Sequence, residues 1–104
     1  MFVLFDHGTP KGLVRVLSGH TVHTAQSKGW DTLMLNAAEV AGFEVLLTTD
    51  RRIRYQQNLA ARRIALVVLT GGTRWSRARQ HADRIVAAVA SATPGSYTEV
   101  EIPF

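Results

Sequence analysis

The chain has 104 residues, of which 46% are hydrophobic, so we expect one folded domain, residues 1–104, with a modest core. Its 12 Lys and Arg residues outnumber its 8 Asp and Glu residues, and the net charge of +4 favours a polyanionic partner, nucleic acid above all. The absence of cysteine excludes disulfides and thiol catalysis, and the absence of a long apolar run or signal-peptide pattern predicts a cytoplasmic protein with no membrane partner.

Short apolar runs alternate with helical patterns along the chain. We expect strands at residues 2–5, 20–23, 45–49, 64–70 and 97–102. We expect helices between them, at about 10–18, 31–41, 51–60 and 76–92. Thr9 and Pro10 have the residue types of an N-cap and a first helical residue. This alternation predicts an α/β fold, a three-layer α/β/α sandwich with a mostly parallel five-stranded sheet.

Two aspartates each follow an apolar run that is typical of a strand. Asp6 comes directly after residues 2–5, and Asp50 comes directly after residues 45–49. If the two strands are neighbours in a parallel sheet, both carboxylates emerge at its carboxyl edge, where open α/β sheets bind ligands. We therefore expect the two acids to share one divalent metal ion, which favours phosphodiester chemistry. Either aspartate could instead cap the helix that follows it, and this alternative is stronger for Asp50.

Further candidates lie near these acids in the sequence. Glu39, on the expected helix 31–41, could reach the same edge as a third catalytic acid, although a solvated helix glutamate is the ordinary alternative. His7 follows Asp6 and could contact a substrate phosphate. Arginines form two clusters that could bind phosphates or could simply be solvated, and those next to Asp50 are the expected substrate-binding residues. The clusters are Arg51, Arg52, Arg54, Arg62 and Arg63, and then Arg74, Arg77, Arg79 and Arg84.

Several segments resemble small bacterial PIN-like proteins of the Mut7-C type and, more distantly, the toxin PIN ribonucleases of toxin–antitoxin pairs. The segments are residues 4–10 (LFDHGTP), 19–22 (GHTV), 29–30 (GW), 42–50 (GFEVLLTTD) and 55–59 (YQQNL). The resemblance implies an α/β/α sandwich, three or four acids that hold Mg²⁺ or Mn²⁺, and metal-dependent cleavage of single-stranded RNA. By position, Asp6 matches the acid after the first strand and Asp50 the acid after the third.

The chain departs from the PIN-like pattern at three places. The segment after Trp30 is shorter by about one helical turn, so the middle acid is lost or replaced by Glu39. Arg52 stands where relatives often have an acid or asparagine, and His7 stands where many have glutamate.

Two main hypotheses stay open. One is a metal-dependent endoribonuclease that acts as the toxin of a toxin–antitoxin pair. The other is a catalytically degenerate module that binds RNA or an antitoxin-like protein without cleavage. A homodimer is a further open partner, and a flavodoxin-type binder of a small ligand is a remote third hypothesis.

Overall fold

The computed structural model describes residues 1–25, 35–50 and 63–103. Its five strands form one sheet in the order β2-β1-β3-β4-β5, and every neighbouring pair is parallel. The strands are β1 (Phe2–Phe5), β2 (Thr21–Thr24), β3 (Val45–Thr48), β4 (Ala65–Gly71) and β5 (Tyr97–Ile102). The five expected strands are therefore confirmed, with bounds that shift by one residue at most.

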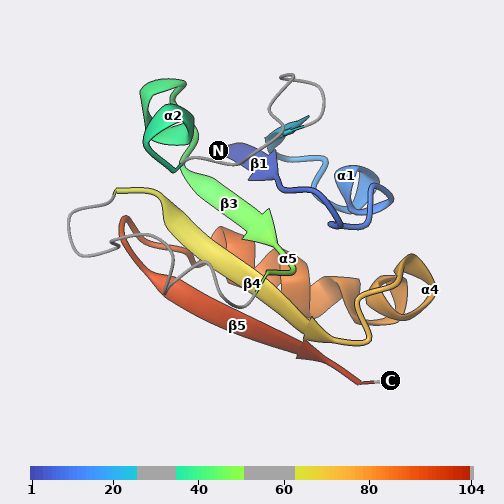
Figure 1. Ribbon diagram of the computed structural model, residues 1–104. Helices are drawn as coiled ribbons and strands as arrows, with labels where there is room; N and C mark the ends of the chain where they lie inside the picture. The colour runs from blue at the N-terminus through green and yellow to red at the C-terminus, as the bar shows by residue number, and fades with distance from the viewer. Residues whose placement is uncertain (26–34, 51–62, 104) are drawn as a thin grey trace.

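Helices cover both faces of this sheet and make it the middle of three layers (Figure 1). One face packs against α1, α4 and α5, and the other packs against α2. The helical elements are α1 (Leu13–Val16), α2 (Leu35–Val40), α4 (Trp75–Ala78), a 3₁₀ turn η2 (Arg79–His81) and α5 (Ala82–Ala90). The expected three-layer α/β/α sandwich is thus confirmed. The helix expected at 51–60 lies outside the described residues.

The core divides into two clusters because successive side chains of a strand point to opposite faces of the sheet. In β1, Val3 and Phe5 join the cluster under α1 and α5, whereas Leu4 joins the cluster under α2. The strands β3 and β4 alternate in the same way, and all of these side chains are buried. Continuous burial on both faces explains why the strands are apolar runs rather than alternating patterns.

The strand order contains one reversal, between β1 and β3. The chain leaves β1 to form β2 on one side, and then returns to build β3, β4 and β5 on the other side. At such a reversal the connections that follow the two central strands diverge to opposite faces, which opens a crevice beyond their carboxyl ends. The order itself is that of flavodoxin-type sheets, so it establishes a doubly wound fold class and not an activity.

Two helical expectations were wrong in detail. Thr9 and Pro10 do not begin a helix: α1 begins at Leu13 without a side-chain cap, because the Thr9 hydroxyl donates instead to the Leu47 carbonyl at 3.0 Å. The expected helix 76–92 is divided at His81, whose φ of −122° and ψ of 24° are not helical. This break allows α4 and α5 to pack independently of one another, with Ala78 and Ile85 both fully buried.

Gly71 provides a test of how β4 and β5 meet. Its φ is +82°, and a Cβ at this position would lie 2.3 Å from the carbonyl oxygen of Ile102. Gly71→Ala should therefore destabilise the fold by more than about 1–2 kcal/mol, the usual cost of a left-handed non-glycine residue, because the backbone of β5 must also move. Gly19→Ala, with nothing within 4 Å of its Cβ, is the matched control. Urea unfolding of both variants measures the difference, and equal stabilities would contradict this packing.

Candidate acidic site at the carboxyl edge of the sheet

Asp6 directly follows β1, at the carboxyl edge of the sheet and beside the paired strand β3. Its backbone N–H donates to the Leu47 carbonyl at 3.0 Å, which extends the pairing of the two strands by one residue. The carboxylate is half-buried and accepts two hydrogen bonds. Oδ1 accepts from the His7 N–H at 2.8 Å, and Oδ2 accepts from the Thr48 hydroxyl at 2.8 Å. Asp6 therefore has a fixed orientation as well as a position.

Thr48 connects the two aspartates. It is the last residue of β3 and is fully buried. Its hydroxyl donates to Asp6 Oδ2 and accepts from the Asp50 N–H at 3.1 Å, so both roles of the hydroxyl are used. Asp50 is half-buried and follows β3 by two residues. The expectation that Asp6 and Asp50 follow adjacent strands is confirmed, because β1 and β3 are paired.

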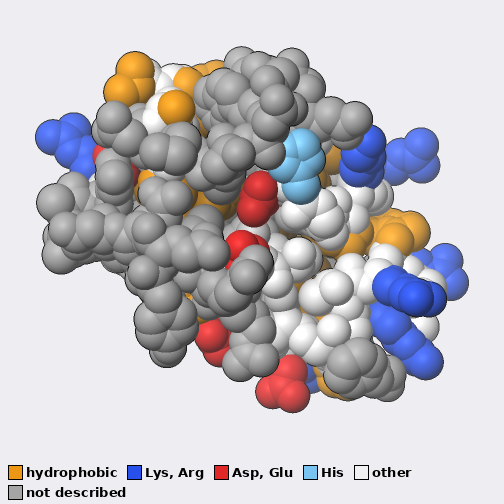
Figure 2. All heavy atoms as spheres, in the orientation of Figure 1, with side chains coloured by type: hydrophobic (Ala, Val, Ile, Leu, Met, Phe, Trp, Pro, Cys, Tyr) orange, Lys and Arg blue, Asp and Glu red, His pale blue; other side chains and the backbone are white. Residues whose placement is uncertain are grey.

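The loop after β1 forms a small cavity beside Asp6. This cavity has a volume of about 60 Å³, and its lining includes Asp6, His7, Lys11 and Thr24. His7 is exposed, and Lys11 brings a positive charge to the same wall. In Figure 2, acidic side chains and a histidine lie together near the middle of the face shown, and Lys and Arg side chains gather where α1 and α4 lie in Figure 1. An anion that approaches this edge therefore meets cations next to the acids.

Glu39 does not join this site, contrary to the expectation for a third acid. Its Oε1 accepts from the N–H of Arg63, which precedes β4, at 3.2 Å. Glu39 therefore lies at the amino edge of the sheet, opposite the two aspartates. The reason is directional: a crossover helix runs back from the carboxyl edge to the amino edge, and Glu39 belongs to the last turn of α2, shortly before β3 begins.

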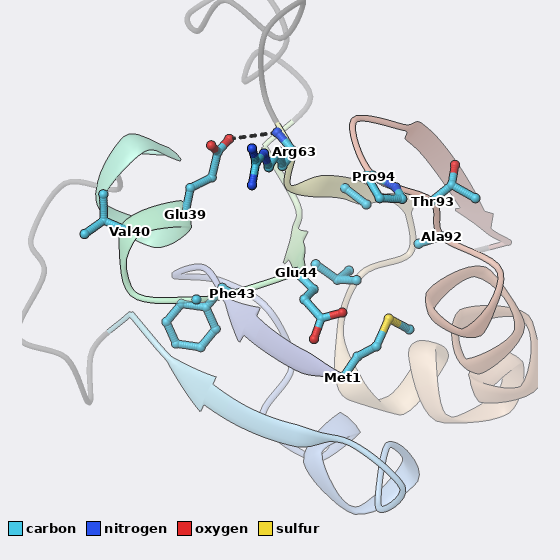
Figure 3. A pocket seen from close by; sticks show the side chains of 12 residues that line it. Met1, Glu39, Val40, Phe43, Glu44, Arg63, Ala92, Thr93 and Pro94 are labelled. Atoms are coloured by element: carbon cyan, nitrogen blue, oxygen red, sulfur yellow. Dashed lines mark hydrogen bonds between the residues drawn. The ribbon is translucent and has the colours of Figure 1, made fainter.

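A larger cavity of about 450 Å³ opens at that amino edge (Figure 3). Glu39 is directed toward Arg63 on one side of it, and Glu44 lies beside Met1. Glu44 Oε1 accepts from the Phe2 N–H at 3.3 Å, so each glutamate is attached to the backbone that precedes or begins a strand. These contacts give both glutamates a structural task at the start of the sheet.

The arginines predicted to bind substrate next to Asp50 are not among the described residues. They are Arg51, Arg52 and Arg54. Within the described ranges 1–25, 35–50 and 63–103, no group of three or more His, Asp or Glu residues is arranged to hold a metal ion. Among the described residues, Asp6 and Asp50 remain the two candidate ligands of the expected metal ion.

Thr48, Thr9 and Lys11 were not predicted as site residues. The signal for Thr48 was a hydroxyl at the end of an otherwise apolar strand, two positions before Asp50. Such a residue is easily interpreted as a β-branched core residue, because threonine favours strands for the same steric reason as valine. Only the register of β1 against β3 shows that its hydroxyl reaches Asp6.

Comparison of the chain with protein-family models, with curated proteins and with solved structures found no match. No helix of the described residues is long and apolar enough to cross a membrane. The chemistry of the site must therefore be argued from its own residues.

Thr48 gives the sharpest test of the acidic edge. Thr48→Val keeps the shape but removes both hydrogen bonds of the hydroxyl, and should cost about 1–3 kcal/mol because a half-buried carboxylate loses a donor. Thr48→Ser keeps the hydroxyl and loses one methyl group, which should cost about 0.8 kcal/mol. Urea unfolding should therefore rank wild type above Thr48→Ser and Thr48→Ser above Thr48→Val. The reverse order of the two variants would mean that the hydroxyl is not a structural bridge.

Proposed function

We propose that this chain is a metal-dependent endoribonuclease of PIN-like type, in which Asp6 and Asp50 hold one Mg²⁺ or Mn²⁺. The observation that carries the proposal is the Thr48 bridge, which fixes Asp6 and the backbone of Asp50 at the reversal point of the sheet. Ligands of doubly wound sheets bind at this point. The proposed substrate is single-stranded RNA, and the proposed setting is the cytoplasm, where the chain acts as the toxin of a toxin–antitoxin pair.

The donor set fits one hard divalent ion. Each oxygen of the Asp6 carboxylate accepts one hydrogen bond, and an ionised carboxylate has about four acceptor positions, so capacity for a cation remains. Two carboxylates suit a Mg²⁺ ion that keeps most of its water ligands. When bound, such an ion supplies an acidified water and neutralises charge on a phosphodiester in the transition state.

The protein's own residues would orient the substrate. His7 and Lys11 line the cavity next to Asp6, where they would contact a phosphate. Arg51, Arg52 and Arg54 follow Asp50 in the sequence and would extend the cationic surface along the RNA backbone. Counterion release from such contacts makes binding weaken steeply with salt.

A second candidate is a degenerate module that binds RNA or an antitoxin-like protein without cutting. The position of Glu39 favours it, because the third acid of the sequence-based hypothesis is used at the amino edge instead. A two-metal mechanism that clamps both the attacking and the leaving oxygen would ordinarily need more acidic ligands than two. Self-association into a homodimer is compatible with either candidate.

Cleavage of a labelled single-stranded RNA separates the two candidates. With Mg²⁺ or Mn²⁺ present, Asp6→Asn and Asp50→Asn should each lower the cleavage rate by about 10²-fold or more, because loss of one group that stabilises transition-state charge costs at least this much. Glu39→Gln, an acid at the opposite edge, is the matched control and should cleave like wild type. Equal rates for wild type and Asp6→Asn would exclude this site, and no cleavage by wild type with either ion would favour the degenerate module.

Metal binding can be tested without any activity. A ligand that binds only the folded state at about 100 times its Kd adds about 2.7 kcal/mol of stability. Saturating Mn²⁺ should therefore raise the Tm of wild type by several degrees and that of Asp6→Asn much less. Glu39→Gln should respond like wild type. A Tm increase that is the same in Asp6→Asn and wild type would assign the ion to another site.

A further inference from the structure

Trp75 is a large aromatic side chain that is only partly covered. It is the first residue of α4, just after the turn that follows β4, and 38% of its surface is exposed. Its indole lies against Gly12: a Cβ built on Gly12 would be 2.5 Å from Cε2 and 2.7 Å from both Cδ2 and Cζ2. Three ring atoms at nearly equal distances mean that Gly12 faces the plane of the ring rather than its edge.

This contact requires glycine at position 12, and part of the ring stays exposed beside it. Any side chain at Gly12 would occupy the space of the indole, so the backbone of the loop after β1 is what supports the ring. Gly12 covers one face of the indole, and 38% of the Trp75 surface remains exposed. A flat aromatic face that is held from behind is the arrangement on which nucleic-acid bases stack.

Exposed arginines lie near Trp75. Arg74 precedes it directly, and Arg15 is on α1, close to Gly12 in the chain. The sequence has no Asp or Glu from residue 7 to residue 30 or from residue 51 to residue 82, so neither α1 nor α4 carries a compensating acid. Figure 2 shows Lys and Arg side chains around hydrophobic ones at the edge where α1 and α4 lie.

We propose that this Trp75 surface (Gly12, Arg15, Arg74 and Trp75) binds single-stranded RNA by stacking an unpaired base on the indole and pairing the flanking phosphates with the arginines. The inference rests on the proposed function for the identity of the nucleic acid. It adds the place on the protein where the RNA strand binds. A duplex keeps its base faces stacked internally, so a stacking surface selects unpaired strands.

The topology connects this surface to the acids. Gly12 belongs to the loop that follows β1 and Asp6, and Trp75 follows β4, the strand paired with β3. Loops after β1, β3 and β4 all emerge at the carboxyl edge of the sheet, so a strand of RNA that passes over Trp75 continues toward Asp6 and Asp50. An acidic protein would also be attracted by the arginines, and competition between RNA and an acidic peptide tests this alternative.

Intrinsic fluorescence gives a direct measurement of stacking. In a Trp30→Phe background Trp75 is the only tryptophan. A 12-nucleotide oligo(U) RNA should quench the Trp75 fluorescence on binding. EDTA is present so that no cleavage occurs. In the full chain, Trp75→Leu should weaken binding of the same RNA by about five-fold to 150-fold, the range for loss of one stacked base. Trp75→Phe keeps a ring on Gly12 and should lose less, which separates stacking from misfolding.

The arginines are tested by the salt dependence of binding. Arg74→Gln should reduce the slope of log affinity against log salt by about 0.7, the value for one phosphate contact to a single strand. Arg63→Gln, an exposed arginine at the opposite edge, is the matched control and should leave the slope unchanged. Affinity that Trp75→Leu leaves unchanged, equal affinity for duplex RNA, or displacement of the RNA by an equimolar acidic peptide would each overturn the proposal.

These readouts are separate from cleavage. Binding that depends on Trp75 with no cleavage by wild type would support the Trp75 surface and reject the ribonuclease. Cleavage that depends on Asp6 but not on Trp75 would support the ribonuclease and reject the surface.

Discussion

The hydroxyl of Thr48 is the contact on which the acidic edge depends. It donates to the carboxylate after β1 and accepts from the backbone after β3, so one buried atom determines how both strand ends leave the sheet. Valine would fill the same volume and would pack as well against an apolar layer. The hydroxyl at this position is therefore explained by the two polar groups that it joins. Its two hydrogen bonds offset the free-energy cost of burying it.

The hydrogen bonds of Thr48 also bear on the negative charge at the acidic edge. Two ionised carboxylates at neighbouring strand ends repel one another. The two donors that contact Asp6 are one N–H and one O–H, and neither adds a positive charge to the site. The negative charge of the pair is consequently not neutralised by these contacts. A cation bound as proposed would meet a carboxylate, that of Asp6, whose orientation these contacts already set.

Much of the fold could be predicted from local patterns, whereas the site could be predicted only in part. The strands were recognisable because burial on both faces makes them continuous apolar runs. Asp6 and Asp50 were recognisable as candidates because each follows one of these runs. Glu39 was misplaced because helical spacing indicates a face and not which end of the sheet a turn of helix reaches.

Other features depended on contacts between distant segments. Thr9 has the residue type of a helix cap, but the Leu47 carbonyl, 38 positions away in the chain, takes its hydroxyl. The division of the expected helix 76–92 has the same origin. Its residues favour one continuous helix locally, yet Trp75 packs on Gly12 in the loop after β1, and α5 covers the sheet. No pattern within either segment contains this information.

In the two proposals, the residues that would hold an RNA strand are distinct from those that would cut it. The acids follow β1 and β3, whereas the exposed indole follows β4 and rests on a glycine of the β1 loop. Losing an acidic ligand would thus leave the aromatic and cationic contacts in place, because they belong to different loops of the same edge. For this reason the two candidates, ribonuclease and degenerate module, share the same fold. A single substitution at the acidic edge could convert the first into the second, with RNA binding retained. The proposed reaction therefore rests on the acids alone, and the proposed RNA ligand rests on the surface beside them.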